Sequence, residues 1–150
     1  DENGGFSLSG RENEVLIFRP RETWDGAMPS GNSAMAYDLV RLYQLTDDDE
    51  FGREADRQLR SMSGEAARAP MGCSFFLLAL SEHADPPEHV VIVPGPGAEP
   101  RLLADGFPAD ALVSVLSGET EKYRLINGHT TYYVCKGHAC LPPVNDPAGL

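Results

Sequence analysis

Residues 46–64 read TDDDEFGREADRQLRSMSG, and this stretch decides the fold of the first half of the chain. Thr46 to Asp49 supply a cap and first-turn acids, because negative charge is favourable near a helix N-terminus. Apolar and charged side chains then recur at helical spacing on opposite sides: Phe51, Ala55, Leu59 and Met62 against Arg53, Glu54, Arg57 and Arg60. The pattern predicts an amphipathic helix with one face on a core, ending at or near Gly64.

The segment before this helix has the composition of a polar loop that leads into another helix. Residues 25–33 read DGAMPSGNS, in which glycine, proline, asparagine and serine are typical of turns. Asn32 or Ser33 can cap a helix that runs to about Leu45. Further upstream, Val15 to Phe18 forms an apolar run that predicts a short strand or a buried extended segment.

A third helix is predicted from Gly72 to His83, and it is apolar nearly all round. A helix of that kind must be buried or face a partner. We therefore predict a homo-oligomer that buries the surface around Phe75, Phe76 and Leu78, because large exposed apolar patches favour association.

After Pro86-Pro87 the segments become short and β-like. Strands are predicted near residues 90–94, 111–116 and 130–135, with one helical turn at 101–105. Asn127-Gly128 between residues 123–126 and 130–134 is a strong hairpin signal. The chain is thus expected to be α+β, with antiparallel helices in residues 1–85 and a small sheet with a C-terminal hairpin in residues 86–150.

The composition disfavours two classes of partner. There are 12 Lys and Arg residues against 23 Asp and Glu residues, which gives a formal net charge of −11. Phosphate backbones and anionic membranes attract clustered cations, so we expect neither nucleic acid nor membrane as a partner. Three cysteines, an odd number, do not resemble a secreted disulfide framework, so we expect a cytoplasmic protein.

The loop at residues 25–33 is the first candidate site. Asp25, Ser30, Asn32 and Ser33 could bind a hydroxyl-rich ligand or an anion beside the free amides of a helix N-terminus. The alternative is a capped turn whose side chains bond their own backbone, and the residue types favour it. The sequence identifies no catalytic residue and no cofactor, and leaves open whether the protein is an enzyme.

Cys135 and Cys140 form the second candidate site, with His129 and His138 nearby. Zinc binding needs about four ligands and is disfavoured, so we expect no metal. A disulfide or redox pair is an alternative, although the spacing is wider than that of a Cys-x-x-Cys motif. The residues themselves favour two structural thiols near a strand end.

Several of these motifs, in this order, resemble the C-terminal region of the spermatogenesis-associated, thioredoxin-domain-containing protein family. The resemblance rests on DGAMPSGNS followed by Leu39, Arg41-Leu42 and Leu45-Thr46, on Gly4-Gly5-Phe6, on residues 90–93, and on the closing residues Tyr132-Tyr133-Val134-Cys135, Cys140, Pro143 and Asp146-Pro147. It implies a C-terminal piece of a longer protein that also carries a thioredoxin-like domain and a six-hairpin (α/α) toroid. Residues 1–85 would be the last toroid helices, and residues 86–150 a small appended α/β element.

The resemblance also implies roles for particular residues. Asp25, Ser30, Asn32 and Ser33 would line the toroid cavity with Arg19 nearby, and Cys135 and Cys140 would match the family's paired cysteines. The leading hypothesis is a toroid fragment whose loop contributes to a carbohydrate-like binding cavity. The alternatives are a non-catalytic interaction or redox-docking module that uses the two cysteines, with the upstream toroid and thioredoxin-like domains as partners, and a purely structural closing segment.

Overall fold

The computed structural model describes residues 4–10, 19–105, 107–108, 111–137 and 139–149. The predicted extended run from Val15 to Phe18 lies outside these residues. The chain divides into two compact units, Asp1–Asp85 and Pro86–Leu150, which we call the helical unit and the sheet unit. Of the helices in the described ranges, none combines the length and apolar character that a bilayer crossing requires.

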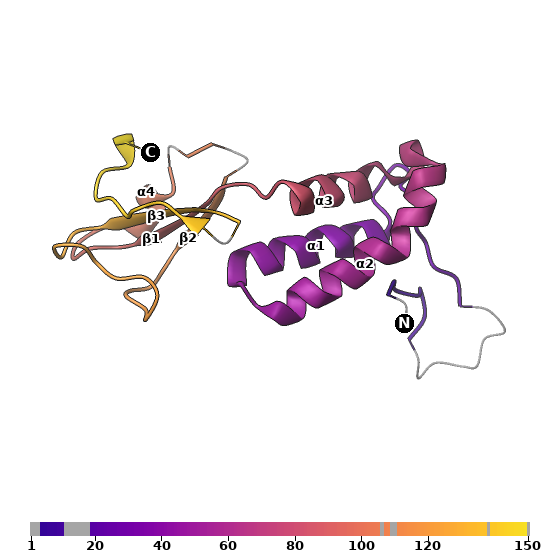
Figure 1. The fold of residues 1–150 in the computed structure, drawn as a ribbon, viewed down its shortest axis with the longest axis horizontal. Coiled ribbons are helices and arrows are strands. Elements are labelled where there is room, and N and C mark those ends of the chain that lie inside the picture. Colours follow the sequence, from indigo (N-terminus) through magenta and orange to yellow (C-terminus); the bar gives the residue numbers. More distant parts are fainter. Residues whose placement is uncertain (1–3, 11–18, 106, 109–110, 138, 150) are drawn as a thin grey trace. The chain divides into compact units, whose positions relative to one another are not determined.

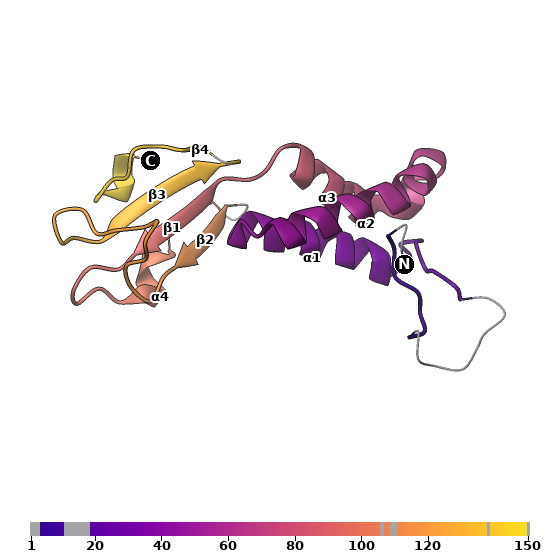
Figure 2. The same ribbon diagram turned by 60° about the horizontal axis from the view of Figure 1, so that its bottom comes forward.

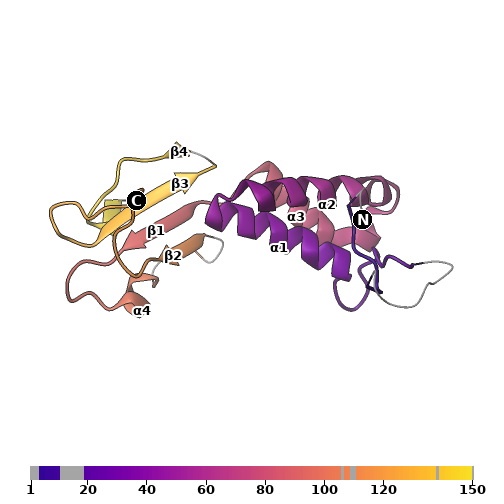
Figure 3. The same cartoon turned by 90° about the horizontal axis from the view of Figure 1, so that it is seen from below.

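The helical unit contains three α-helices that lie side by side (Figures 1 and 3). They are α1 (Gly31–Thr46), α2 (Asp49–Arg68) and α3 (Ser74–Ala84), and a short 3₁₀ helix, η1 (Pro70–Cys73), leads into α3. Asp47 has a left-handed backbone (φ 59°) between α1 and α2, and this tight connection makes the two helices antiparallel. The predicted helical hairpin is therefore present.

The core of the helical unit lies between all three helices. Its members share nearly complete burial; the largest of them are Phe76, Met62, Leu39, Leu59 and Val40. On α3, however, burial is one-sided, because Phe76 and Ala79 are buried whereas Leu77, Leu78 and Leu80 are 36–45% exposed. Phe76 is thus covered by its own chain, and the expectation that a second copy buries it is wrong.

Two predicted helix ends differ from the structure. Ser30, rather than Asn32 or Ser33, is the N-cap of α1, and its hydroxyl accepts a hydrogen bond from the Ser33 amide. The second helix does not end at Gly64 but continues to Arg68. The extra turn packs Ala66 into the core, so burial outweighs the low helix propensity of glycine.

The sheet unit contains a four-stranded mixed sheet in the order β2-β1-β3-β4 (Figure 2). Its strands are β1 (His89–Val93), β2 (Leu112–Val115), β3 (Thr131–Lys136) and β4 (Ala139–Cys140). β1 pairs in parallel with β2, through a crossover that holds the short helix α4 (Pro100–Leu103), and antiparallel with β3. Helices followed by a small sheet make an α+β chain, as predicted.

One face of the sheet carries the second core, built on Val90, Ile92, Tyr132 and Val134. Alternate residues of a strand point to the same face, so the apolar residues at these positions form one continuous layer. Leu103, Phe107, Val113, Val115 and Val144 pack against this layer.

The Asn127-Gly128 turn forms, but the strand predicted at residues 123–126 does not. Both turn residues have positive φ (54° and 73°), as a tight hairpin turn requires, and a single bridge joins Ile126 to His129. Side-chain hydrogen bonds replace the backbone hydrogen bonds that a second strand would make. The Ile126 amide donates to Thr131 Oγ1 (2.9 Å), and the Tyr133 hydroxyl donates to the Arg124 carbonyl (2.8 Å).

Candidate functional site

Asp25 ties the starts of two helices together. Its Oδ1 accepts a hydrogen bond from the Ser30 amide (2.8 Å) at the start of α1, and its Oδ2 accepts one from the Phe75 amide (2.8 Å) at the start of α3. The residue that precedes α3, Cys73, makes no side-chain cap. Asp25 therefore supplies from a distant loop the anion that the N-terminus of α3 favours.

The hydrogen bonds keep this carboxylate ionised. Burial by itself would raise the pKa of Asp25, which is 9% exposed. Hydrogen bonds from the Ser30 amide, the Ser33 hydroxyl and the Phe75 and Phe76 amides act in the opposite direction and outweigh burial, so the pKa is lowered from its ordinary value. The site therefore holds a fixed negative charge.

Ser30 and Ser33 are almost inaccessible and bond to each other. The Ser30 hydroxyl lies 2.9 Å from the Ser33 hydroxyl, and their side chains belong to residues that are 2% and 0% exposed. As a result, these two hydroxyls serve the loop and the first turn of α1 and do not face an open space.

Asn32 joins three segments of the helical unit. Its Oδ1 accepts from the Phe6 amide (2.7 Å), and its Nδ2 donates to the carbonyls of Phe6 (2.9 Å) and Glu22 (2.8 Å). Gln58 of α2 donates to Asn32 Oδ1 (3.1 Å) and accepts from the Gly5 amide (2.9 Å). Asn32 is 3% exposed, so its amide stabilises the approach of the N-terminal segment to α1 and α2.

The buried Gln58 is a member of this network that the sequence patterns did not identify. It lies three residues after Ala55 and four before Met62, so helical spacing placed it on the core face of α2. A glutamine on such a face needs buried hydrogen-bond partners, and that requirement was the available signal.

An open pocket of about 240 Å³ lies beside Asp25. Its wall combines the loop with the first turns of α3: Asp25, Gly26, Ala27, Met28, Pro29, Ser74, Phe75 and Leu78. Of the five residues predicted to bind a ligand, Asp25 lines the pocket. Ser30, Asn32, Ser33 and the half-buried Arg19 are not among its lining residues.

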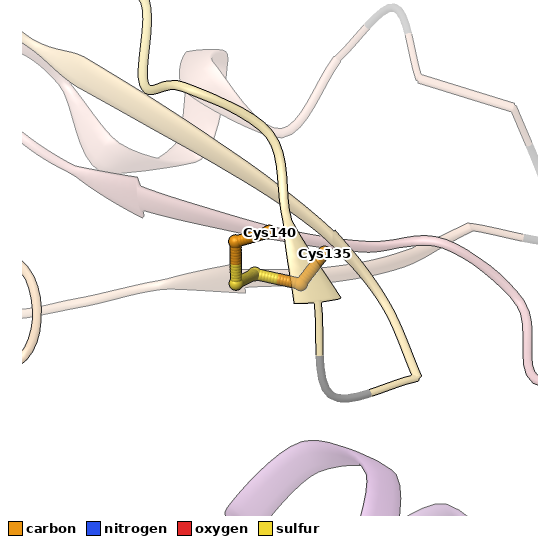
Figure 4. The surroundings of a disulfide bond; sticks show 2 residues. All are labelled: Cys135 and Cys140. Atoms are coloured by element: carbon orange, nitrogen blue, oxygen red, sulfur yellow. A yellow bond between two sulfur atoms is a disulfide. The ribbon is translucent and has the colours of Figure 1, made fainter.

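Cys135 and Cys140 lie on β3 and β4 and form a disulfide (Figure 4). The expectation of two separate structural thiols is therefore wrong, because the β3–β4 register places the two cysteines directly opposite each other. Cys73 is a buried free thiol whose pKa is raised, first by burial and then by the charges of Asp25 and Glu65. Within the described residues, no three His, Cys, Asp or Glu side chains gather as a metal site would require.

Comparison with known proteins gives a consistent set of relatives. Over 98% of this chain, the sequence is 28% identical to spermatogenesis-associated protein 20 of Rattus norvegicus. Over 99% of this chain, it is 28% identical to the Homo sapiens protein of that name. This confirms the resemblance. An uncharacterised protein of Caenorhabditis elegans is 25% identical over 93% of the chain. No family model matches the chain.

The chain spans about a fifth, 21%, of the length of spermatogenesis-associated protein 20. The similarity thus concerns one region of a much longer protein. The toroid and the thioredoxin-like domain that the resemblance implies remain predictions about the rest of that protein.

Proposed function

We propose that the helical unit supplies one wall of a cavity for a hydroxyl-rich, carbohydrate-like ligand in a longer protein similar to spermatogenesis-associated protein 20. The observation that carries this proposal is a fixed, ionised carboxylate beside apolar side chains at an open pocket. In this arrangement Asp25 would bind hydroxyl groups, while Met28, Phe75 and Leu78 would contact the apolar face of a sugar ring.

A ligand hydroxyl at this pocket would join hydrogen bonds that Asp25 already accepts. A carboxylate offers about four lone-pair sites. Each oxygen of Asp25 accepts one hydrogen bond from a backbone amide, and the Ser33 hydroxyl and the Phe76 amide also act on the carboxylate, so a ligand would share a lone pair with one of these donors. A hydroxyl donating to a charged acceptor makes a stronger bond than a neutral pair does. Sites for whole small molecules are typically about 300–1,000 Å³, so this pocket fits one ring of a ligand that neighbouring parts of the longer protein would enclose further.

The geometry divides the predicted ligand residues into two roles. Asp25 would contact the ligand, whereas Ser30, Asn32 and Ser33 would hold the loop in place, because their polar atoms bond within the chain. Arg19 would lie near the cavity, as the resemblance implies.

Trp24 offers a direct test because it is the single tryptophan of the chain. It precedes Asp25, and its ring lies against the backbone of Gly72 in η1. The Gly72 carbonyl accepts a hydrogen bond from the Asp25 amide, which links η1 to the loop. Titration of the chain with mono- and disaccharides should change the Trp24 fluorescence in a saturable way, and the same titration of the longer protein should give a lower Kd.

Two methionines provide a matched pair for this titration. Met28 lines the pocket and is 78% exposed, whereas Met71 is 93% exposed and lies outside the pocket wall. Met28→Ala should weaken sugar binding several-fold while Met71→Ala leaves it unchanged. An equal response of both variants, or no saturable signal in the longer protein, would remove the proposal.

A second candidate is a non-catalytic interaction module. The observations in its favour are the three half-exposed leucines of α3 and the disulfide at the sheet edge. The leucines would meet the remaining toroid helices or a second copy of the chain, and Cys135 and Cys140 would be presented to the thioredoxin-like domain. Light scattering of Leu78→Glu beside the unmodified chain tests self-association, and mixing with the separately purified upstream domain tests docking.

A further inference from the structure

A row of four residues crosses the sheet unit at the level of the disulfide. The register pairs His89 with Leu112 of β2 and with Cys135 of β3, and pairs Cys135 with Cys140 of β4. Directly opposite residues of paired strands point to the same face with Cβ atoms about 4.5–5.5 Å apart. The imidazole of His89 and the disulfide of Cys135 and Cys140 thus lie in one row on one face.

The two cysteine residues of the disulfide differ in their access to solvent. Cys135 is 6% exposed, whereas Cys140 belongs to the exposed class, as do Lys136, Gly137 and Ala139 of the same hairpin. β4 has two residues and is the last strand of the sheet on that side. Because thiol–disulfide exchange requires an incoming thiolate to reach one sulfur, Cys140 is the accessible point of attack.

The disulfide closes a short loop, so its contribution to stability is at the low end for disulfides. It joins residues five apart, and the stabilisation from a disulfide grows with the length of the loop that it closes. The strand end is also held by the hydrogen bond from the Leu141 amide to the Val134 carbonyl (2.8 Å). Because this hydrogen bond and the pairing of β3 with β1 do not depend on the disulfide, we expect the sheet to persist when the bond opens.

We propose that Cys135–Cys140 is a reversible thiol–disulfide exchange site whose electron donor is a dithiol. A donor thiolate attacks Sγ of Cys140 and forms a mixed disulfide with it. The Cys135–Cys140 bond breaks, and its electron pair leaves on Sγ of Cys135, which takes up a proton. The second donor thiol then displaces Cys140 from the mixed disulfide, so the donor loses two electrons to become a disulfide and the pair gains them as two thiols.

His89 is the positioning residue of this site. Its Nε2 lies 2.9 Å from Ser114 Oγ, which fixes the ring on the face that carries Cys135. A neighbouring protonated imidazole lowers the pKa of a thiol, and a thiol of lower pKa leaves faster. An imidazole directly opposite Cys135 in the register would therefore speed the departure of its sulfur.

The test traps the first step in the 150-residue chain. The chain is incubated with glutathione, quenched with an alkylating agent, and mapped by mass spectrometry. We expect glutathione on Cys140, the alkyl group on Cys135, and no label on the buried Cys73. Glutathione on Cys135 would overturn the assignment of the attacked sulfur, and a pair that dithiothreitol reduces no faster than the chain unfolds would overturn the exchange site.

His89→Gln tests the positioning role, with His129→Gln in the exposed turn as its control. His89→Gln should slow reduction several-fold, and it should lower the thiolate absorbance of Cys135 at neutral pH in a reduced Cys140→Ser background. Equal rates and equal absorbance profiles in the two variants would refute that role. The exchange site and the docking module proposed above use the same two cysteines. If dithiothreitol reduces the disulfide but no thioredoxin-like domain binds the chain, the docking module is refuted and the exchange site is not.

Discussion

Replacement of Asp25 by alanine should destabilise the helical unit by about 3 kcal/mol. The variant removes the acceptors for the Ser30 and Phe75 amides, each 2.8 Å from a carboxylate oxygen. A hydrogen bond to a charged group is worth about 1.5–3 kcal/mol, and two at the lower value give about 3 kcal/mol. The Phe75 amide then begins α3 without a cap, and the Ser30 amide loses its acceptor although α1 keeps the cap that the Ser30 hydroxyl provides.

Urea denaturation followed by far-ultraviolet circular dichroism measures this loss, because the long α-helices all belong to the helical unit as described. At an m-value of about 1.5 kcal/mol per M, the midpoint should fall by about 2 M with an unchanged slope. Asp38→Ala is the matched control, since Asp38 is an exposed residue of α1, and such changes stay within about 0.5 kcal/mol. A shift in Asp25→Ala no larger than that of the control would refute the capping role.

The same pair of variants reports on pH. The pKa of Asp25 is lowered by folding from an ordinary value of 3.8, so its contribution is complete above that value and is lost as pH falls through the folded pKa. The control should therefore lose stability in the acid range below about pH 4, and Asp25→Ala should lose less over the same range. Parallel curves would show that Asp25 is not the group responsible.

Three further outcomes follow from burial and bonding. Asn32→Ala should lower the free energy of unfolding by about 2–4 kcal/mol and expose the segment before residue 10 to limited proteolysis. An unchanged digestion pattern would contradict the Asn32 network. Phe76→Ala should cost about 3–5 kcal/mol by urea denaturation whereas Leu78→Ala, at 45% exposure, costs less than about 1 kcal/mol; similar values would contradict the one-sided burial of α3. Reduction of Cys135–Cys140 should lower the stability of the sheet unit by about 2 kcal/mol, because the disulfide closes a loop of about six residues. The helical circular dichroism signal should stay unchanged, and a loss of helix would show that the two units are not independent.

The elements that the sequence predicted best are those with a strong period or a specific turn. The one-sided apolar line of α2 and the Val90–Val93 run needed no distant information, and the Asn127-Gly128 turn formed as its residue types require. Their ends were less predictable, because Ala66 extends α2 beyond Gly64 through a tertiary contact.

The site depended on contacts between residues far apart in the sequence. Composition identified Asp25 and Asn32 as polar residues of a loop, but their partners Phe75, Phe6 and Gln58 lie 26 to 50 positions away. No local pattern distinguishes a side chain that faces a ligand from one that caps a distant helix. The disulfide likewise depended on strand register, which a short hairpin sets only once β4 is in place.

The strand order has a consequence for synthesis on the ribosome. β1 is flanked by β2 and β3, and both partners are translated after it. The nascent chain therefore carries Val90-Val91-Ile92-Val93 with at least one unpaired edge until residue 136 has emerged, whereas the helical unit before it is already complete. Short apolar β-branched segments of this kind associate readily with other chains, so co-translational folding of this protein would be most sensitive to chaperones during that interval.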